Sequence, residues 1–162
     1  VILPGVGSFK RSMNLLKKRN LDVAIKDFIS VPSNRFLGIC LGMQLLYDFT
    51  EEDDGCRGLG IIKGTVNRLV ESDDIKVPNV GWRQINIKSP SGLYKDITSK
   101  LIFYFVHSYA CQTIDENIVT GTLDHNSLFS CSIEYENIYG VQFHPEKSQK
   151  TGLNILSNFI KL

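Results

Sequence analysis

The organisation of this chain follows from one stretch, Arg35-Phe36-Leu37-Gly38-Ile39-Cys40-Leu41-Gly42-Met43-Gln44. Its first half is compact and apolar, as in a buried strand, and helix-type sequence follows at once over 41–49. Glycines stand two residues before and two residues after Cys40. A strand that turns directly into a helix needs residues without a Cβ there, and the turn exposes the central side chain. The stretch therefore predicts a nucleophile elbow with Cys40 at its tip.

Before this stretch, the pattern predicts one strand and two helices. The strand over 1–3 runs into the flexible loop Pro4–Gly7, after which Ser8 can cap a helix over 9–18. A second amphipathic helix is predicted over 21–29, where apolar residues recur at helical spacing.

After an acidic, glycine-rich loop over 50–60, the pattern changes to short β-type stretches and a closing helix over 153–162. The predicted strands cover 65–70, 82–87, 101–106, 118–122, 129–135 and 138–143. Helices alternate with strands early, and hairpin-like strands come later. We therefore expect a single α/β domain over 1–162, with a mainly parallel sheet and antiparallel additions.

Composition excludes several classes of protein. The chain has 162 residues, 43% hydrophobic and 22% charged, with a formal net charge of +1. That charge gives no electrostatic reason to expect nucleic acid or a membrane surface as partner, and no apolar run reaches the roughly 20 residues that span a bilayer. The four cysteines fit no metal-site spacing, so we expect reduced thiols in a cytoplasmic protein that needs no metal or cofactor.

The elbow suggests how Cys40 would react. At a helix N-terminus, the helix dipole and free N–H groups are expected to lower the pKa of a thiol, and the N–H of Leu41 points toward a developing oxyanion. Gln44, one helical turn on, carries an amide that can donate to and accept from a substrate amide. The alternative is a buried cysteine whose neighbouring glycines only ease packing.

A thiol nucleophile needs a base, and the chain has three histidines. His125 lies in a polar stretch that reads as a surface turn, and His107 ends the strand over 101–106. His144 ends the strand over 138–143 and is followed by Pro145 and Glu146. Strand ends are where α/β active sites assemble, and Glu146 can orient the imidazole of His144. The alternative is a strand end beside a solvated glutamate.

Four motifs together resemble the class I glutamine amidotransferases, and among them the glutaminase subunits of imidazole glycerol phosphate synthase. They are Pro4-Gly5-Val6-Gly7, Gly38-Ile39-Cys40-Leu41-Gly42-Met43-Gln44, His107-Ser108-Tyr109 and Gln142-Phe143-His144-Pro145-Glu146-Lys147-Ser148. The narrower likeness also uses Val77-Pro78-Asn79-Val80-Gly81-Trp82. The resemblance extends over the whole chain and implies a flavodoxin-like fold with helices on both faces of the sheet.

The resemblance also implies roles for individual residues. Cys40, His144 and Glu146 would form the catalytic triad, and backbone N–H groups of Val6 or Gly7 and of Leu41 would form the oxyanion hole. Substrate glutamine would be held by Gly5, Gln44, Ser108 and Tyr109. A partner subunit would meet the chain at Asn79, Trp82 and Lys147, although Trp82 could equally be a core residue and Lys147 a solvated charge.

The chain departs from the family pattern at two places. A βαβ-sized segment of roughly 40 residues precedes the Pro4–Gly7 loop in the family, and we expect this chain to lack that segment. Family members commonly carry histidine where this chain has Asn79, on the side that faces the synthase.

The expected function is hydrolysis of L-glutamine through a thioester on Cys40. The ammonia would pass to a (β/α)₈ synthase subunit in a heterodimer of histidine biosynthesis. Three alternatives stay open: an ammonia donor for a surface-polysaccharide sugar, a catalytically inert docking subunit, and a γ-glutamyl peptide hydrolase.

Overall fold

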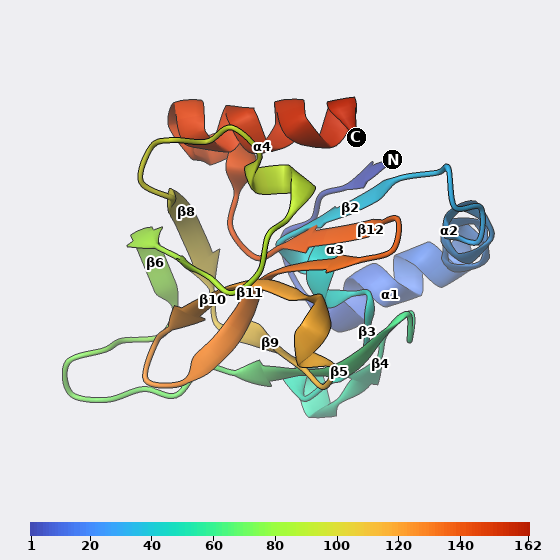
Figure 1. Cartoon of the computed structure of the whole chain (residues 1–162). Helices are drawn as coiled ribbons and strands as arrows, with labels where there is room; N and C mark the ends of the chain where they lie inside the picture. The colour runs from blue at the N-terminus through green and yellow to red at the C-terminus, as the bar shows by residue number, and fades with distance from the viewer.

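A ten-stranded mixed sheet forms the centre of the molecule, in a computed structural model that describes all 162 residues (Figure 1). Its strands are hydrogen-bonded in the order β1-β2-β12-β11-β9-β5-β3-β4. Off this path, β10 pairs with β11, and β7 pairs with β10. These strands are β1 (Ile2–Leu3), β2 (Phe36–Ile39), β3 (Tyr47–Thr50), β4 (Cys56–Arg57), β5 (Ile62–Arg68), β7 (Asn86–Ile87), β9 (Tyr109–Thr113), β10 (Val119–Asp124), β11 (Leu128–Tyr135) and β12 (Ile138–Val141). Two further strands, β6 (Asn79–Gln84) and β8 (Ile102–His107), pair with each other as a separate ribbon.

Parallel pairing surrounds the predicted elbow. Strand β2 lies between β1 and β12 and is parallel to both, and β3 is parallel to β5. Antiparallel pairs join these regions and add the outer strands. The expected α/β class is confirmed, and so is a sheet that combines parallel pairing around the elbow with antiparallel additions.

Helices cover both faces of the sheet (Figure 1). They are α1 (Phe9–Lys18), α2 (Leu21–Ile29), the short α3 (Leu41–Gln44) and α4 (Gln149–Lys161). Alternate residues of a strand point to opposite faces, so Phe36 packs in the core beneath α1 while Leu37 packs in the core beneath α4. Both of these cores therefore hold β2 in place directly before the elbow.

The helix predicted over 41–49 is wrong beyond its first turn. It ends after Gln44, and Tyr47–Thr50 forms strand β3. The carbonyl oxygens of Leu45 and Leu46 accept from the backbone N–H groups of Leu59 and Ile61, at 2.8 and 2.9 Å. Aromatic and β-branched residues favour a strand, and the pairing of 47–50 with β5 supplies the partner that the local sequence could not show.

Most other predicted elements are present with small shifts of their ends, but the strand predicted over 82–87 is divided at Ile85 between β6 and β7, which lie in different sheets. The two N-terminal helices have the predicted bounds, whereas the predicted closing helix begins four residues earlier, at Gln149. Strand β9 was not predicted, because it follows His107 and Ser108 with no turn signal between them. The predicted apolar face of α2 is only partly covered, with Ile25 half-buried and Leu21 exposed.

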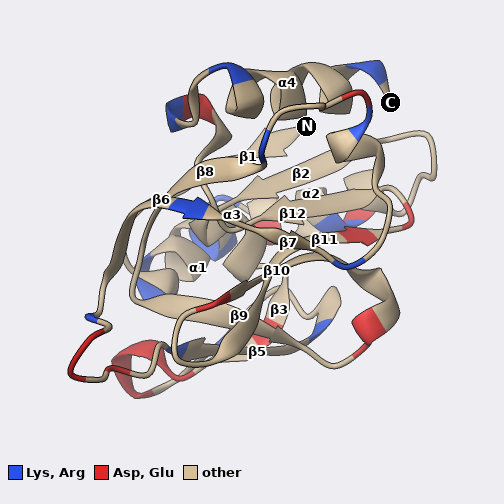
Figure 2. Ribbon diagram, turned by 60° about the vertical axis from the view of Figure 1, so that its left-hand side comes forward, with Lys and Arg blue, Asp and Glu red and all other residues tan.

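Charged residues of both signs are spread along the chain, with lysines on α4 and acidic residues on several loops (Figure 2). None of the helices combines the length and the hydrophobicity that crossing a membrane requires.

Candidate active site

Cys40 stands at the tip of a strained turn between β2 and α3. Its φ and ψ are 53° and −111°, a conformation that costs free energy for a residue with a side chain. The flanking glycines make the turn possible, because a Cβ on Gly38 would lie 2.7 Å from the Gly42 oxygen, and one on Gly42 only 1.8 Å from the Leu3 oxygen. The elbow predicted from the sequence is therefore present, and both glycines are required by close backbone contacts.

His144 leaves the sheet beside Cys40. Strands β2 and β12 are parallel neighbours with Ile39 opposite Val141, and the Cys40 N–H donates to the Val141 oxygen at 2.7 Å. The Nδ1 atom of His144 lies 2.7 Å from Glu146 Oε1. Its Nε2 atom is buried and has no hydrogen-bond partner. A buried imidazole nitrogen with a free lone pair can accept a proton from a thiol.

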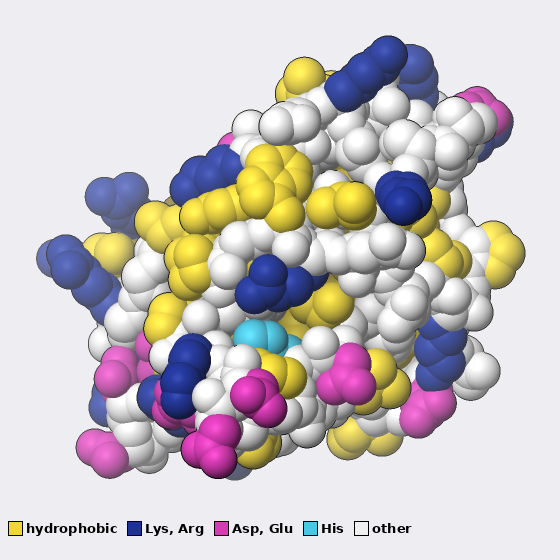
Figure 3. Space-filling view, turned by 90° about the vertical axis from the view of Figure 1, so that its left-hand side faces the viewer, with side chains coloured by type: hydrophobic (Ala, Val, Ile, Leu, Met, Phe, Trp, Pro, Cys, Tyr) yellow, Lys and Arg dark blue, Asp and Glu magenta, His cyan; other side chains and the backbone are white.

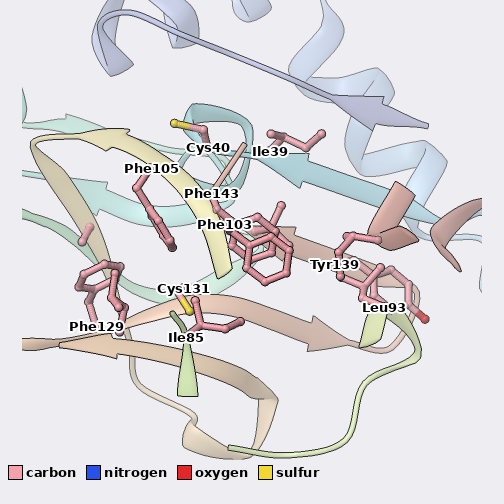
Figure 4. Close-up of a cluster of buried hydrophobic side chains, with 14 of the residues drawn as sticks. Ile39, Cys40, Ile85, Leu93, Phe103, Phe105, Phe129, Cys131, Tyr139 and Phe143 are labelled. Carbon is pink, nitrogen blue, oxygen red and sulfur yellow. The ribbon is translucent and has the colours of Figure 1, made fainter. Parts of the chain in front are cut away.

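The pKa of the Cys40 thiol is raised to about 11, mainly because burial disfavours the thiolate. The N–H of Leu41 acts in the opposite direction and lowers it. The expectation of a lowered pKa is therefore wrong, because α3 is too short and Cys40 too buried for the helix N-terminus to outweigh desolvation. Figure 4 shows Cys40 at the rim of an aromatic cluster, with its sulfur directed away from the stacked rings of Phe103 and Phe143.

A cavity of about 400 Å³ opens next to Cys40. Most residues assigned to the oxyanion hole or to substrate binding line it, namely Val6, Gly7, Leu41, Gln44, Ser108 and Tyr109. Gly5 does not line this cavity but lies close to Leu41, where a Cβ on Gly5 would be 3.2 Å from the Cβ of Leu41. The structure thus brings three of the predicted segments, 6–7, 40–44 and 108–109, around one space.

Two residues at the site were missed in the sequence. Glu52 is the only charged residue that lines the cavity, and its Oε2 accepts from the Phe9 N–H at 2.9 Å. Gln142 is fully buried, and its Nε2 lies 3.6 Å from Cys40 Sγ. Glu52 stands in the acidic run Glu51–Asp54, whose composition predicts a loop and does not distinguish Glu52 from its neighbours. Gln142 lies two residues before His144, but nothing in the sequence indicates where its amide points.

The other two histidines each have a ring nitrogen close to a backbone carbonyl oxygen. His107 Nδ1 lies 2.9 Å from the Tyr109 oxygen, and burial lowers the pKa of His107 to about 4. His125 is only 5% exposed and its Nε2 lies 3.0 Å from the Lys76 oxygen, so the predicted surface turn is wrong for its side chain. In each ring one nitrogen is therefore engaged by a backbone carbonyl oxygen, whereas Nε2 of His144 has no partner.

The three residues assigned to a partner interface differ in exposure. Asn79 is fully buried and pairs with His107 across β6 and β8, so its side chain is not exposed for a partner to contact. Trp82 is 43% exposed and packs edge-to-face on Tyr104, and Lys147 lies over the same ring at 5.9 Å. Figure 3 shows hydrophobic side chains gathered on this side of the molecule, with lysines and arginines around them.

All four cysteines are free thiols, and no group of three or more His, Cys, Asp or Glu side chains could hold a metal ion. The chemistry that the site supports is therefore that of a thiol and an imidazole, oriented by a carboxylate.

Comparison with known proteins gives one family. A family model described as glutamine amidotransferase class-I matches residues 1–162. Two curated relatives bear the name imidazole glycerol phosphate synthase subunit HisH. The one from Moorella thermoacetica is 44% identical, over 100% of this chain and 76% of its own length. The one from Pyrococcus furiosus is 45% identical, over 100% of this chain and 81% of its own.

Solved structures show the same fold. A crystal structure of a glutamine amidotransferase superposes with a TM-score of 0.71 at 15% identity, covering 98% of this chain and 77% of that one. A glutamine amidotransferase from Thermotoga maritima superposes with a TM-score of 0.65 at 16% identity, covering 99% of this chain and 62% of that one.

Proposed function

The chain belongs to the class I glutamine amidotransferases, and on that premise we propose that it is the glutaminase subunit of an imidazole glycerol phosphate synthase. The observation that carries the proposal is the different environment of the two ring nitrogens of His144. Its Nδ1 is engaged by Glu146 and its Nε2 is buried and free, next to the strand whose end holds Cys40.

The reaction begins with transfer of the Cys40 proton to Nε2 of His144. Because burial keeps the thiol protonated at neutral pH, this transfer is needed before the sulfur can attack the side-chain carbonyl of glutamine. The Leu41 N–H, with an N–H of the loop at Val6 and Gly7, stabilises the oxyanion, at roughly 3 kcal/mol for each donor.

The leaving nitrogen takes the proton from His144 and departs as ammonia, leaving a glutamyl thioester on Cys40. Water, deprotonated by the same imidazole, then releases glutamate and restores the thiol. Glu146 keeps Nδ1 protonated and stabilises the imidazolium that forms in each half of the cycle.

Substrate glutamine is bound in the cavity beside Cys40. The carboxylate of Glu52 supports recognition of an ammonium group, because it is the one charge on the cavity wall. Gln44, Ser108 and Tyr109 supply polar contacts from two other sides. This arrangement suits a substrate that carries an α-amino group as well as a carboxamide.

The ammonia passes to a (β/α)₈ synthase subunit in a cytoplasmic heterodimer. The exposed face of β6 and β8 supports docking there, because Trp82, Val80 and Val106 leave apolar surface uncovered beside the cavity. Lys147 lies next to this face and would pair with an acidic group of the partner. Asn79, which is buried, gives no reason to choose a different partner.

Glutamate release by the full-length chain, with and without the synthase subunit, tests the proposal. Cys40→Ala should abolish release in the complex, while Cys56→Ala, at a half-buried thiol outside the cavity, should retain it. Glutamate release by Cys40→Ala would refute the proposed nucleophile. Full turnover of wild type without any synthase subunit would favour a γ-glutamyl hydrolase instead.

A further inference from the structure

Gln142 occupies the centre of a buried hydrogen-bond chain at the site. It follows β12 directly and lies two residues before His144. Its Nε2 donates to Cys40 Sγ at 3.6 Å, and its Oε1 accepts from Gln44 Nε2 at 3.0 Å. One buried amide thus contacts both the nucleophile and a residue of the cavity wall.

The contact with Gln142 fixes which way the amide of Gln44 points. Gln44 Nε2 donates to Gln142 Oε1 and also to the Tyr109 oxygen, at 2.8 Å. A carboxamide nitrogen carries two hydrogens, so both are used. The atom that Gln44 has left for a ligand is therefore its oxygen, which accepts hydrogen bonds and suits an N–H group of the substrate.

The far end of the chain holds the Tyr109 oxygen in place. His107 must donate from Nδ1 to that oxygen, since a carbonyl can only accept. Its Nε2 then accepts from Asn79 Nδ2 at 3.1 Å. The Tyr109 oxygen, which can only accept, fixes the direction of the links on both sides of it, toward Asn79 in β6 and toward the sulfur of Cys40.

We propose that Gln142 is a positioning residue for the glutaminase reaction, a role that rests on the function proposed above. Its N–H group holds the sulfur of Cys40 at the cavity and favours the thiolate. Its carbonyl oxygen orients the amide of Gln44, so that Gln44 presents an acceptor to the substrate. Loss of the first contact affects kcat, and loss of the second affects KM.

Two substitutions in the full-length chain, assembled with its synthase subunit, separate these contacts. Gln142→Glu keeps an acceptor for Gln44 but replaces the donor to Cys40 with a carboxylate. Gln142→Met removes both contacts at similar volume. We expect kcat to fall by roughly 10- to 100-fold in both variants, because a hydrogen bond to a charged group is lost. KM for glutamine should rise by about 10-fold in Gln142→Met and stay within about twofold in Gln142→Glu.

The rate at which iodoacetamide alkylates Cys40, followed by mass spectrometry across a pH series, gives a readout that does not need turnover. Its midpoint should move upward by about one pH unit in both variants. Gln112→Met, at an exposed amide in β9 outside the site, is the matched control and should change neither kinetics nor alkylation. Thermal unfolding identifies any variant that fails to fold.

A second comparison covers the case in which Gln142→Met is unstable. Gln142→Leu, which also removes the acceptor, should raise KM when Gln44 is present but raise it no further when added to Gln44→Met, because the amide that Gln142 orients is then gone. The proposal would be overturned if Gln142→Met kept the wild-type KM and alkylation midpoint. An equal rise of KM in Gln142→Met and Gln142→Glu would also overturn it. Absence of glutamine turnover by the wild-type complex would instead count against the proposed function, while a shifted alkylation midpoint would still support the contact with Cys40.

Discussion

His144 and Glu146 form a hydrogen bond of 2.7 Å between Nδ1 and Oε1, while Nε2 of the same ring is buried without a partner. A carboxylate can only accept, so Nδ1 carries the proton and Nε2 presents a lone pair. The side chain of Glu146 is 48% exposed, and that of His144 only 3%. The imidazole is therefore held by packing, and its tautomer is set by a carboxylate that reaches in from the surface.

We expect Glu146→Gln to lower kcat for glutamine by roughly 10- to 100-fold with little change in KM, because the neutral amide stabilises the imidazolium less. Steady-state glutamate release in the complex with the synthase subunit measures both constants. Glu116→Gln, at an exposed carboxylate paired with Lys88, is the control. An unchanged kcat in Glu146→Gln would show that the carboxylate has no part in the reaction.

Glu52→Gln should raise KM for glutamine by about 10-fold and leave kcat nearly unchanged, because the only charge on the cavity wall is lost. The amide oxygen can still accept from the Phe9 N–H, so the fold is expected to persist. Asp53→Asn is a matched control on the same turn, since Asp53 accepts from Ser8 outside the cavity. Equal KM values in the wild type and Glu52→Gln would exclude an ammonium contact at this carboxylate.

Gly42→Ala should lower the free energy of unfolding by roughly 3 kcal/mol, since the added Cβ would meet the Leu3 oxygen at 1.8 Å and force β1 and the elbow apart. Glutaminase activity should be lost along with the geometry of the elbow. Gly5→Ala, whose nearest contact would be 3.2 Å, should shift the unfolding temperature much less. Similar unfolding temperatures for the two variants would mean that the elbow tolerates a side chain.

Stability should decrease in mild acid because of His107. Burial lowers the pKa of His107 to about 4, below its ordinary value near 6.5, so the unfolded chain binds a proton more readily than the folded one. This stabilisation is complete above about pH 6.5 and is lost as the pH falls toward 4, an effect of about 3 kcal/mol.

Urea unfolding at a series of pH values tests this window. The variant His107→Gln cannot titrate, so its stability should vary less than that of the wild type between pH 6.5 and pH 4, and the two curves should approach each other at the acidic end. Parallel curves over that range would show that His107 is not the residue responsible.

Much of the fold was predictable where the sequence pattern is local. The first two helices follow from apolar spacing within each segment, and the elbow follows from two glycines around Cys40. Strand β3 was mistaken for helix, because its leucines and aromatic residues suit either structure until pairing with β5 decides. Prediction thus failed where a distant strand selects the local conformation.

In the candidate site, too, contacts between residues close in sequence were predictable and contacts between distant residues were not. The sequence suggested that His144 and Glu146 act together because they are two residues apart. It did not suggest the contact of Gln142 with Cys40, or that of Glu52 with Phe9, because 102 and 43 residues separate these pairs. It also assigned Asn79 to a partner interface, whereas pairing of β6 with β8 turns that side chain inward against His107.

By itself, then, the sequence determined that Cys40 stands at a tight turn between two glycines and that a carboxylate, Glu146, follows His144 by two residues. Each of these is set by backbone geometry within a few residues. Only the tertiary structure decided that burial favours the protonated thiol, that the amide nitrogen of Gln44 is engaged within the protein, and that Gln142 links Gln44 to Cys40. Burial and hydrogen-bond direction depend on which atoms surround a group, and those atoms come from strands that only the folded sheet brings together.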